Sequence, residues 1–250
     1  MKRPRHLKSV VLFGSAIALA GGTLGGIPGV AIAQGLQLNL PPLSAPGNRE
    51  SGSTRSPVSC LTNPNEAVYA LMPDTNYGLT ATGYPSFYFY LPETQVQLVR
   101  FVVYEEATGN LFYEGQFNIK GDAGIVNLQL PENGIQRPLA VGESYYWYFS
   151  VICDPNNADA DYVVSGTIQR VEAPADLSDA LSAAVPADLP NLYAQAGLWH
   201  DALMASAQLR ASGETAAPWQ SLLAAVNLDR FASQPMLSDG LEPDMVGATP

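Results

Sequence analysis

Residues 139–154 read L-A-V-G-E-S-Y-Y-W-Y-F-S-V-I-C-D, and this stretch decides the expected fold. Its aromatic and β-branched residues alternate in the way that is typical of a β-strand with one buried side. The alternation predicts a core-facing side that consists of Tyr145, Trp147, Phe149, Val151 and Cys153. Tyr146 and Tyr148 then fall on the opposite side of the same strand.

The same period of two extends over the region from Val58 to Val171. Further strand-like runs, separated by turn residues, are found at 67–71, 85–91, 95–105, 111–119, 124–130 and 161–171. About seven strands in roughly 115 residues fit a β-sandwich. We expect this sandwich to span residues 58–173.

A turn leads directly into the aromatic strand. Leu139, Gly142 and Tyr145 resemble the tyrosine corner of immunoglobulin-like and fibronectin type III domains, in which the tyrosine hydroxyl bonds back to the chain upstream. The resemblance implies an immunoglobulin- or fibronectin III-like sandwich. An ordinary aromatic strand in some other all-β fold is the alternative.

After Ala173 the apolar residues recur every three to four positions, which predicts a helical subdomain over 174–235 and a polar tail over 236–250. The expected class is therefore α+β, mainly β. Four residues, Tyr193, Gly197, Trp199 and Ala202, stand at the offsets of a tetratricopeptide (TPR) helix hairpin. A generic helical hairpin packed on the sandwich is the alternative.

The N-terminus has the three parts of a secretory signal peptide. Four basic residues within 1–8 precede an apolar stretch, and Ala31-Ile32-Ala33 fits a cleavage site. An uncleaved membrane anchor is the alternative, but several glycines and Pro28 interrupt its second half. We expect cleavage after Ala33, export to the periplasm or the medium, and a disordered linker over 34–57 that is rich in Gly, Pro and Ser.

Charge and cysteine content agree with an exported, acidic protein. The 250 residues include 12 basic and 23 acidic ones, and cleavage would remove four basic residues and no acid, so the net charge falls from −11 to −15. We expect no nucleic-acid partner, because phosphate binding needs clustered Lys and Arg. Cys60 and Cys153 predict one disulfide, with two separate buried thiols as the alternative.

Several short motifs occur in combination along the chain: Cys60-Leu-Thr62, Gly78-Leu-Thr80, 85–91, 124–128, 141–150, Cys153-Asp-Pro155, Gly166-Thr-Ile-Gln-Arg170 and 197–203. In these motifs the chain, from about Arg55 to Pro235, is similar to the exported cyanobacterial proteins grouped as domain of unknown function 928. The resemblance implies secretion and one unit of sandwich plus helices. It implies no catalytic residue, because none is established for the family.

The loop 154–161, D-P-N-N-A-D-A-D, provides a weak metal candidate. Asn157, Asp159 and Asp161 are spaced like the first ligands of a calcium loop, but Ile168 stands where the bidentate glutamate would be. An acidic turn between two strands is the alternative. We expect no other cofactor.

Candidate catalytic residues are weak. His200 and Asp201 are adjacent, and neighbours on a helix do not face each other, so we expect a surface dipeptide. A carboxylate pair for glycoside hydrolysis could come from Glu93, Glu105, Glu106, Glu114 and Asp122, but solvated strand ends explain these residues equally well. We therefore expect that the protein is not an enzyme.

The paired tyrosines are the better candidates for binding. Tyr88 and Tyr90 share one strand face, as Tyr146 and Tyr148 do. Exposed, they could stack on sugar rings or anchor a protein. Alternatively, the helices from 174 onward cover this face, and the tyrosines pack between layers.

We therefore expect an exported, non-enzymatic adaptor of the cell envelope that binds another envelope or secreted protein. Its contact surface would be the hairpin 192–210, with Tyr193 and Trp199, or the outward tyrosines. A carbohydrate-binding module that uses Tyr88, Tyr90, Tyr146 and Tyr148 on a polysaccharide is the alternative. A hydrolase with an unrecognised carboxylate pair is the third reading.

Overall fold

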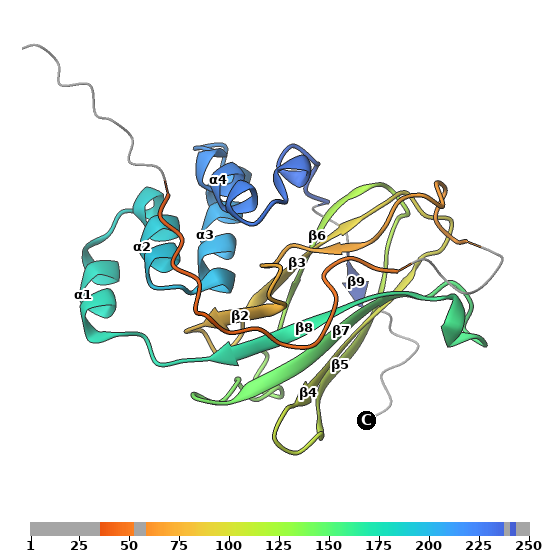
Figure 1. The fold of residues 1–250 in the computed structure, drawn as a ribbon, viewed down its shortest axis with the longest axis horizontal. Helices are drawn as coiled ribbons and strands as arrows, with labels where there is room; N and C mark the ends of the chain where they lie inside the picture. Colours follow the sequence, from red (N-terminus) through yellow and green to blue (C-terminus); the bar gives the residue numbers. More distant parts are fainter. Residues whose placement is uncertain (1–35, 53–58, 238–240, 244–250) are drawn as a thin grey trace, which may run out of the picture. The chain divides into compact units, whose positions relative to one another are not determined.

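A computed structural model describes residues 36–52, 59–237 and 241–243 of the chain. The predicted signal peptide, residues 1–33, lies outside the described residues, as do 34–35 and 53–57 of the predicted linker and most of the predicted tail. The described chain is α+β, with two β-sheets followed by helices (Figure 1).

The smaller sheet contains three antiparallel strands in the order β1 (Tyr69–Ala70), β3 (Ser86–Leu91) and β6 (Gly124–Gln129). All six residues of β3 are buried. A strand alternates its side chains between two faces, so both faces of this sheet must be covered. One face packs on the larger sheet and the other lies under helices.

The larger sheet contains six strands in the order β2 (Tyr77–Thr80), β8 (Tyr162–Arg170), β7 (Ser144–Val151), β4 (Leu98–Glu105), β5 (Leu111–Asn118) and β9 (Glu242–Pro243). β2 runs parallel to β8, and the other pairs are antiparallel. The predicted core face of β7 is confirmed, since Tyr145, Trp147, Phe149 and Val151 are each at most 1% exposed.

Aromatic rings from the two sheets form the centre of the core. Phe89 of β3 stacks on Phe149 of β7, with 4.0 Å between ring centroids, and Phe87 lies 4.9 Å from Phe101 of β4. Aromatic side chains bury large apolar areas and dominate the energetics of cores. The Cys60–Cys153 disulfide is present as predicted, with 5.4 Å between its Cα atoms.

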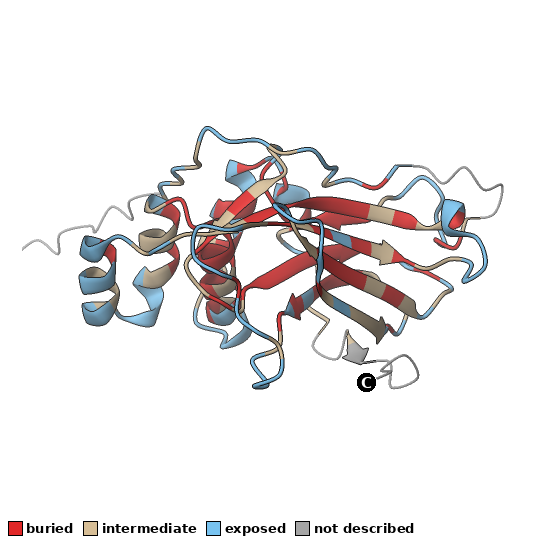
Figure 2. Cartoon of the chain, turned by 90° about the horizontal axis from the view of Figure 1, so that it is seen from below, coloured by how far each residue is buried: buried red, intermediate tan, exposed pale blue. Residues whose placement is uncertain are grey.

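In the described residues, four α-helices lie between β8 and β9: α1 (Ala175–Ala183), α2 (Leu189–Gln195), α3 (Trp199–Ala211) and α4 (Ala217–Ala225). Short 3₁₀ turns are η1 (Ala158–Ala160), η2 (Pro186–Asp188) and η3 (Asp229–Phe231). Figure 1 shows α3 and α4 above β3 and β6, on the side away from β4 and β7. α3 is largely buried, whereas only Leu177 of α1 is (Figure 2). In the part of the chain that the structure describes, we find no helix of the length and apolar character that crossing a membrane requires.

The prediction of a disordered linker is wrong for residues 36–52. The Asn39 amide donates to the Ala194 carbonyl at the end of α2, with a distance of 3.0 Å, and Asn48 forms an antiparallel bridge with Ser165 of β8. Between its Gly, Pro and Ser residues, this segment contains an alternating set of apolar residues. These residues, Leu36, Leu38 and Leu40, pack against the core.

The start of the predicted polar tail also packs on the sheets. The Leu237 amide donates to the Ile125 carbonyl at 2.9 Å, and β9 pairs with Phe117 and Asn118 of β5. Met236 and Leu237 contact the core. Two apolar residues and free backbone groups at the sheet edges are enough to fix these short stretches.

Candidate binding surface

A hydrogen bond between the Tyr145 hydroxyl and the chain upstream, as expected for a tyrosine corner, is present at the start of β7. The backbone N–H of Ala140 donates to the hydroxyl of Tyr145 at 2.9 Å, and Leu139 is fully buried. The guanidinium of Arg170 donates to the Leu139 carbonyl at 2.6 Å. The backbone of the turn before β7 is therefore fixed to the sheet by side chains of β7 and β8.

Tyr88 and Tyr90 of β3 pack under the helices, which is the alternative stated for them. Tyr88 is 5% exposed, and its ring lies 5.7 Å from that of Trp219 in α4. Tyr90 lies 4.6 Å from Phe231 in η3. Burial raises the pKa of Tyr88 far above its usual range. These two tyrosines therefore join the sheet to the helices and lie on no accessible surface.

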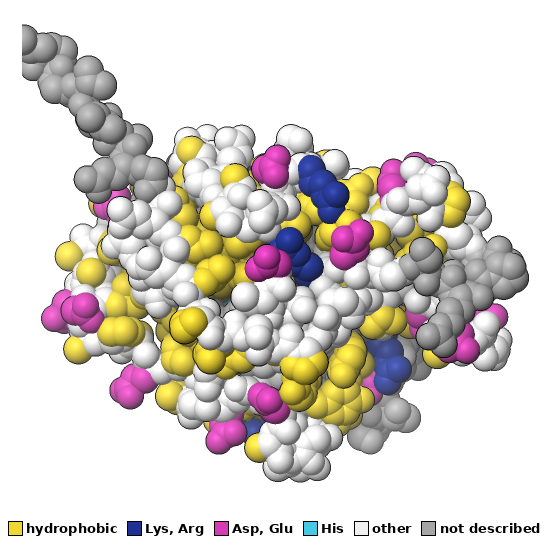
Figure 3. Space-filling view, in the orientation of Figure 1, with side chains coloured by type: hydrophobic (Ala, Val, Ile, Leu, Met, Phe, Trp, Pro, Cys, Tyr) yellow, Lys and Arg dark blue, Asp and Glu magenta, His cyan; other side chains and the backbone are white. Residues whose placement is uncertain are grey.

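Tyr146 and Tyr148 of β7 lie on the far side of the larger sheet, together with Tyr104 of β4. We call these three residues the outer tyrosine face. Tyr148 is 42% exposed, and its ring meets that of Tyr104 at 6.3 Å and 76°. Figure 3 shows hydrophobic side chains gathered low on this side of the molecule, over β7 and β4.

Polar contacts fix one member of the outer tyrosine face. The hydroxyl of Tyr146 donates to Oε1 of Glu106 at 3.1 Å, and this bond is the main cause that raises the pKa of Tyr146. Tyr104 was missed in the sequence, although it belongs to the strand-like run at 95–105. The register places Tyr104 directly opposite Tyr146.

A small hollow of about 190 Å³ adjoins these rings. Gly47 forms part of its wall because the chain at 46–48 runs against β8, where a Cβ on Gly47 would lie 2.7 Å from the Ser165 carbonyl oxygen. The hydroxyl of Ser165 donates to the side-chain oxygen of Asn48 at 3.1 Å. The lining residues are Pro46, Gly47, Tyr146, Trp147, Tyr148, Ser165 and Gly166.

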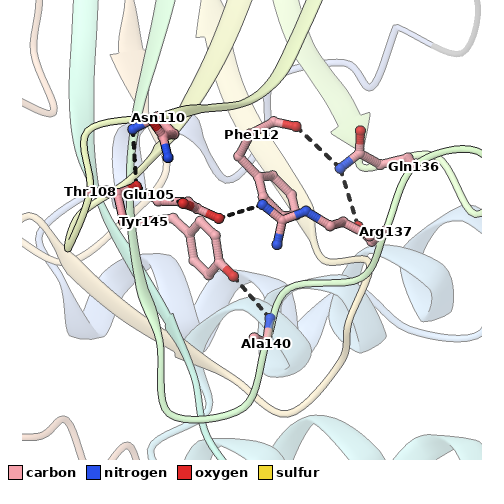
Figure 4. A network of polar contacts seen from close by, with 8 residues as sticks. All are labelled: Glu105, Thr108, Asn110, Phe112, Gln136, Arg137, Ala140 and Tyr145. Atoms are coloured by element: carbon pink, nitrogen blue, oxygen red, sulfur yellow. Dashed lines mark hydrogen bonds and ion pairs between the residues drawn. The ribbon is translucent and has the colours of Figure 1, made fainter.

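A second hollow, of about 330 Å³, lies between the β4–β5 turn and the loop before β7. Arg137 reaches across the ring of Phe112, with its Cζ 4.6 Å from the centroid, and bonds to Glu105 (Figure 4). The hydroxyl of Thr108 also donates to Glu105, at 2.6 Å. The bonds from Thr108 and Arg137 lower the pKa of the Glu105 carboxyl.

Tyr193 and Trp199, the predicted contact residues of the hairpin 192–210, are less accessible than the outer tyrosine face. Trp199 is fully buried, and its indole N–H donates to the Leu71 carbonyl at 3.1 Å, while Tyr193 is half-buried. Gly197, with φ +76°, allows Asn39 to approach, because a Cβ there would lie 2.5 Å from the Asn39 carbonyl oxygen. The segment 36–52 and the sheets thus cover the inner side of this hairpin.

The prediction of a surface dipeptide at His200 and Asp201 is wrong, because both residues are buried. His200 donates from Nδ1 to the Ser86 carbonyl at 3.2 Å, and burial lowers its pKa to about 4. Asp201 accepts the Ala81 amide at 3.1 Å, and burial raises its pKa to about 6. Each side chain holds α3 to a different backbone segment, and nothing joins the two as a catalytic pair.

The calcium candidate uses its side chains on the backbone. Asn157 accepts the Asp159 amide at 3.3 Å as the cap of η1, and Asp161 accepts the Cys153 amide at 3.0 Å. Within the described ranges, no group of three or more His, Cys, Asp and Glu is placed to hold a metal ion. The contacts agree with the alternative of an acidic turn between β7 and β8.

The candidate carboxylates are dispersed or engaged. Glu114 pairs with Arg100 at 2.8 Å, whereas Glu105 and Glu106 have the partners described above. Glu93 and Asp122 are exposed in the loops before β4 and β6. Among the described residues, no hydrogen bond or ion pair joins any two of these five carboxylates.

The family model described as Domain of Unknown Function (DUF928) matches residues 50–236. No curated protein matches the sequence. Among solved structures, the solution structure of the fn3 domain of human collagen alpha-1(XX) chain is similar over 39% of this chain and 87% of that chain, with 17% identity and a TM-score of 0.23. That likeness is too weak to carry an argument about the fold.

Proposed function

The chain belongs to the DUF928 family, and we propose that it is a non-enzymatic, exported adaptor that binds another protein through the outer tyrosine face. The observation that carries this proposal is Tyr148, which is 42% exposed on a rigid strand beside two further tyrosines. Tyrosine is enriched at the centres of protein interfaces, because it offers a large amphipathic area at low entropic cost.

The contrast with the other surfaces supports this choice. Trp199 and Tyr88 are buried, so neither the hairpin nor β3 offers an accessible aromatic cluster. The strands beneath Tyr104 and Tyr148 pair along their length, which keeps the rings in place before a partner arrives. A pre-organised surface loses little conformational entropy on binding.

A glycan ligand is the second candidate, and the hollow beside the tyrosines favours it. Its volume of about 190 Å³ and its lining by two tyrosines and Ser165 suit a ring with one apolar and one hydroxylated side. The edge-to-face arrangement of Tyr104 and Tyr148 favours a protein, since the two rings do not form one flat platform for stacking.

We also propose that the two sheets form an immunoglobulin- or fibronectin III-like sandwich and that α2 and α3 form a TPR-like hairpin. The sheet orders β1-β3-β6 and β2-β8-β7-β4-β5 and the Ala140–Tyr145 bond support the first proposal. The disulfide supports location in an oxidising compartment, the periplasm or the medium.

The test compares Tyr148→Ser with Val185→Ser, a matched control at an exposed apolar residue between α1 and η2. The bait is the chain from residue 34 onward, cross-linked to native envelope, and captured proteins are identified, purified and titrated. We expect one protein whose affinity falls about tenfold or more for Tyr148→Ser and is unchanged for Val185→Ser.

The same variants separate the two candidates. A melting temperature that rises with envelope polysaccharide, and no longer rises after Tyr148→Ser, would replace the protein ligand by a glycan. Equal affinity of both variants for every captured protein would refute the outer tyrosine face as the contact.

A further inference from the structure

Three large apolar side chains are exposed at the end of the sheets where β7 begins. Ile135, in the loop between β6 and β7, is 91% exposed, and Leu111 and Val141 are each 53% exposed. Single exposed apolar residues are normal on protein surfaces. A group of them that is held in place is a feature of interaction sites.

The loop that carries Ile135 is fixed by its own hydrogen bonds. The side-chain oxygen of Asn133 accepts the amides of Ile135 and Gln136, each at 3.0 Å. The side-chain amide of Gln136 then donates to the Phe112 carbonyl at 3.3 Å, which joins the loop to β5 (Figure 4). Leu111 precedes Phe112, so Leu111 and Ile135 each lie one residue from that bond.

The second half of the loop is held as firmly. Arg137 bonds to Glu105 and covers the Phe112 ring, and Ala140 bonds to Tyr145. Figure 4 shows these contacts side by side between the loop and the β4–β5 turn. The bonds on both sides of Ile135 thus hold the backbone of the loop in one conformation, with the Ile135 side chain exposed to water. Exposure of an apolar side chain to water is unfavourable in free energy, and packing within this chain does not offset it.

We propose that Ile135 is the anchor of a second contact, which inserts into an apolar pocket with a basic rim on the partner protein. Leu111 and Val141 are the other two exposed apolar residues at this end of the sheets. The inference rests on the proposed adaptor function and adds to it a separate surface and the chemistry of the partner. Anchors of this kind, rigid before binding, are typical of the few residues that dominate an interface.

Local charge determines the kind of partner. The β4–β5 turn, 105–110, and the loop 131–143 together contain four acidic residues and one basic residue, Arg137, which is paired with Glu105. A surface of that sign repels the anionic face of a membrane. The same surface is complementary to a pocket bordered by Lys or Arg.

The experiment places a photo-cross-linking amino acid at position 135 of the full chain in producing cells, with position 185 as the control. We expect an adduct with one protein at 135 and none with that protein at 185. The purified partner should then bind Ile135→Ser about tenfold or more weakly and Val185→Ser unchanged. Binding of the unaltered chain should weaken as salt is raised, since rim charges are screened.

Other outcomes would overturn the inference. They are an adduct only with a second copy of this chain, equal affinity of the partner for Ile135→Ser and the unaltered chain, or adducts with lipid together with binding to vesicles of phosphatidylcholine and phosphatidylglycerol. Tyr148→Ser, measured beside them, distinguishes the two proposals. If it weakens binding while Ile135→Ser does not, the adaptor function stands and the second contact does not.

Discussion

Two tyrosine pairs with the same pattern have opposite environments. Tyr88 and Tyr90 alternate on β3, and Tyr146 and Tyr148 alternate on β7. The first pair is buried under α4 and η3, whereas Tyr148 is 42% exposed. Alternation determines which face of a strand a residue occupies, but the packing of distant elements determines whether that face is covered.

The largest expected effect on stability comes from the disulfide that joins the segment before the smaller, covered sheet to the end of β7. Cys60 precedes β1 of the covered sheet, and Cys153 follows β7 of the exposed one. We expect the double substitution Cys60→Ser/Cys153→Ser to lower the free energy of unfolding by about 4–5 kcal/mol, because the bond closes a loop of 93 positions. Urea denaturation measures this, and a loss below about 1 kcal/mol would contradict it.

The next effect contrasts the two faces directly. Trp219→Ala removes the side chain that covers Tyr88, and large-to-small changes of a buried Trp cost about 3–5 kcal/mol. Urea denaturation of this variant beside Tyr148→Ala provides the comparison. Equal losses for the two variants would show that the covered and exposed faces do not differ as described.

The pH dependence of the covered side separates two opposing contributions. Asp201 has a folded pKa of about 6, above its unfolded value, so its contribution to stability is present at low pH and lost as the pH rises through 6. His200 has a folded pKa of about 4, below its unfolded value, so its contribution is present above pH 6.5 and lost as the pH falls toward 4.

Substitution should separate these contributions. As the pH is lowered from 7 to 4, the free energy of unfolding of Asp201→Asn should fall relative to that of the unaltered chain. The free energy of unfolding of His200→Asn should rise relative to it over the same range. The scale is about 1.4 kcal/mol for each tenfold change in proton affinity. Urea midpoints measured across this range would contradict the assignment if both variants followed the unaltered chain.

The smallest effect is expected on the exposed side. Tyr148→Ala should change the free energy of unfolding by less than about 0.5 kcal/mol, because substitutions on the surface are nearly neutral. Its melting curve should therefore overlay that of the unaltered chain. A loss of 2 kcal/mol or more, on the order of a core substitution, would mean that the outer tyrosine face is covered.

The strands, the core face of β7 and the disulfide could be predicted from local patterns. Each depends on alternation, turn residues or cysteine count, which a short window of sequence contains. The strand β2 was missed, because Tyr77–Thr80 is a four-residue run whose pairing is with the distant strand β8. Helices were predicted in the right region for the same local reason.

The environment of the candidate site could not be predicted in this way. Burial of His200 depends on Ser86, and the wall at Gly47 depends on Ser165, each more than a hundred positions away. Ile135 stands out only when its exposure and its anchored loop are seen together. Local patterns contain neither kind of information.

The segment at 36–50 has a consequence for the order of folding. Gln37 and Asn39 bond to residues 154 and 156 positions later, and Asn48 to one 115 positions later. A chain is synthesised from its N-terminus, so Gln37 and Asn39 lack these partners until α2 has been made, whereas the far end of the segment pairs earlier, since Glu50 bridges to Tyr69. Contacts of such long range also slow folding, because a large loop must close before they form. Gln37 and Asn39, which are synthesised before every strand, are therefore among the last residues to reach their native place.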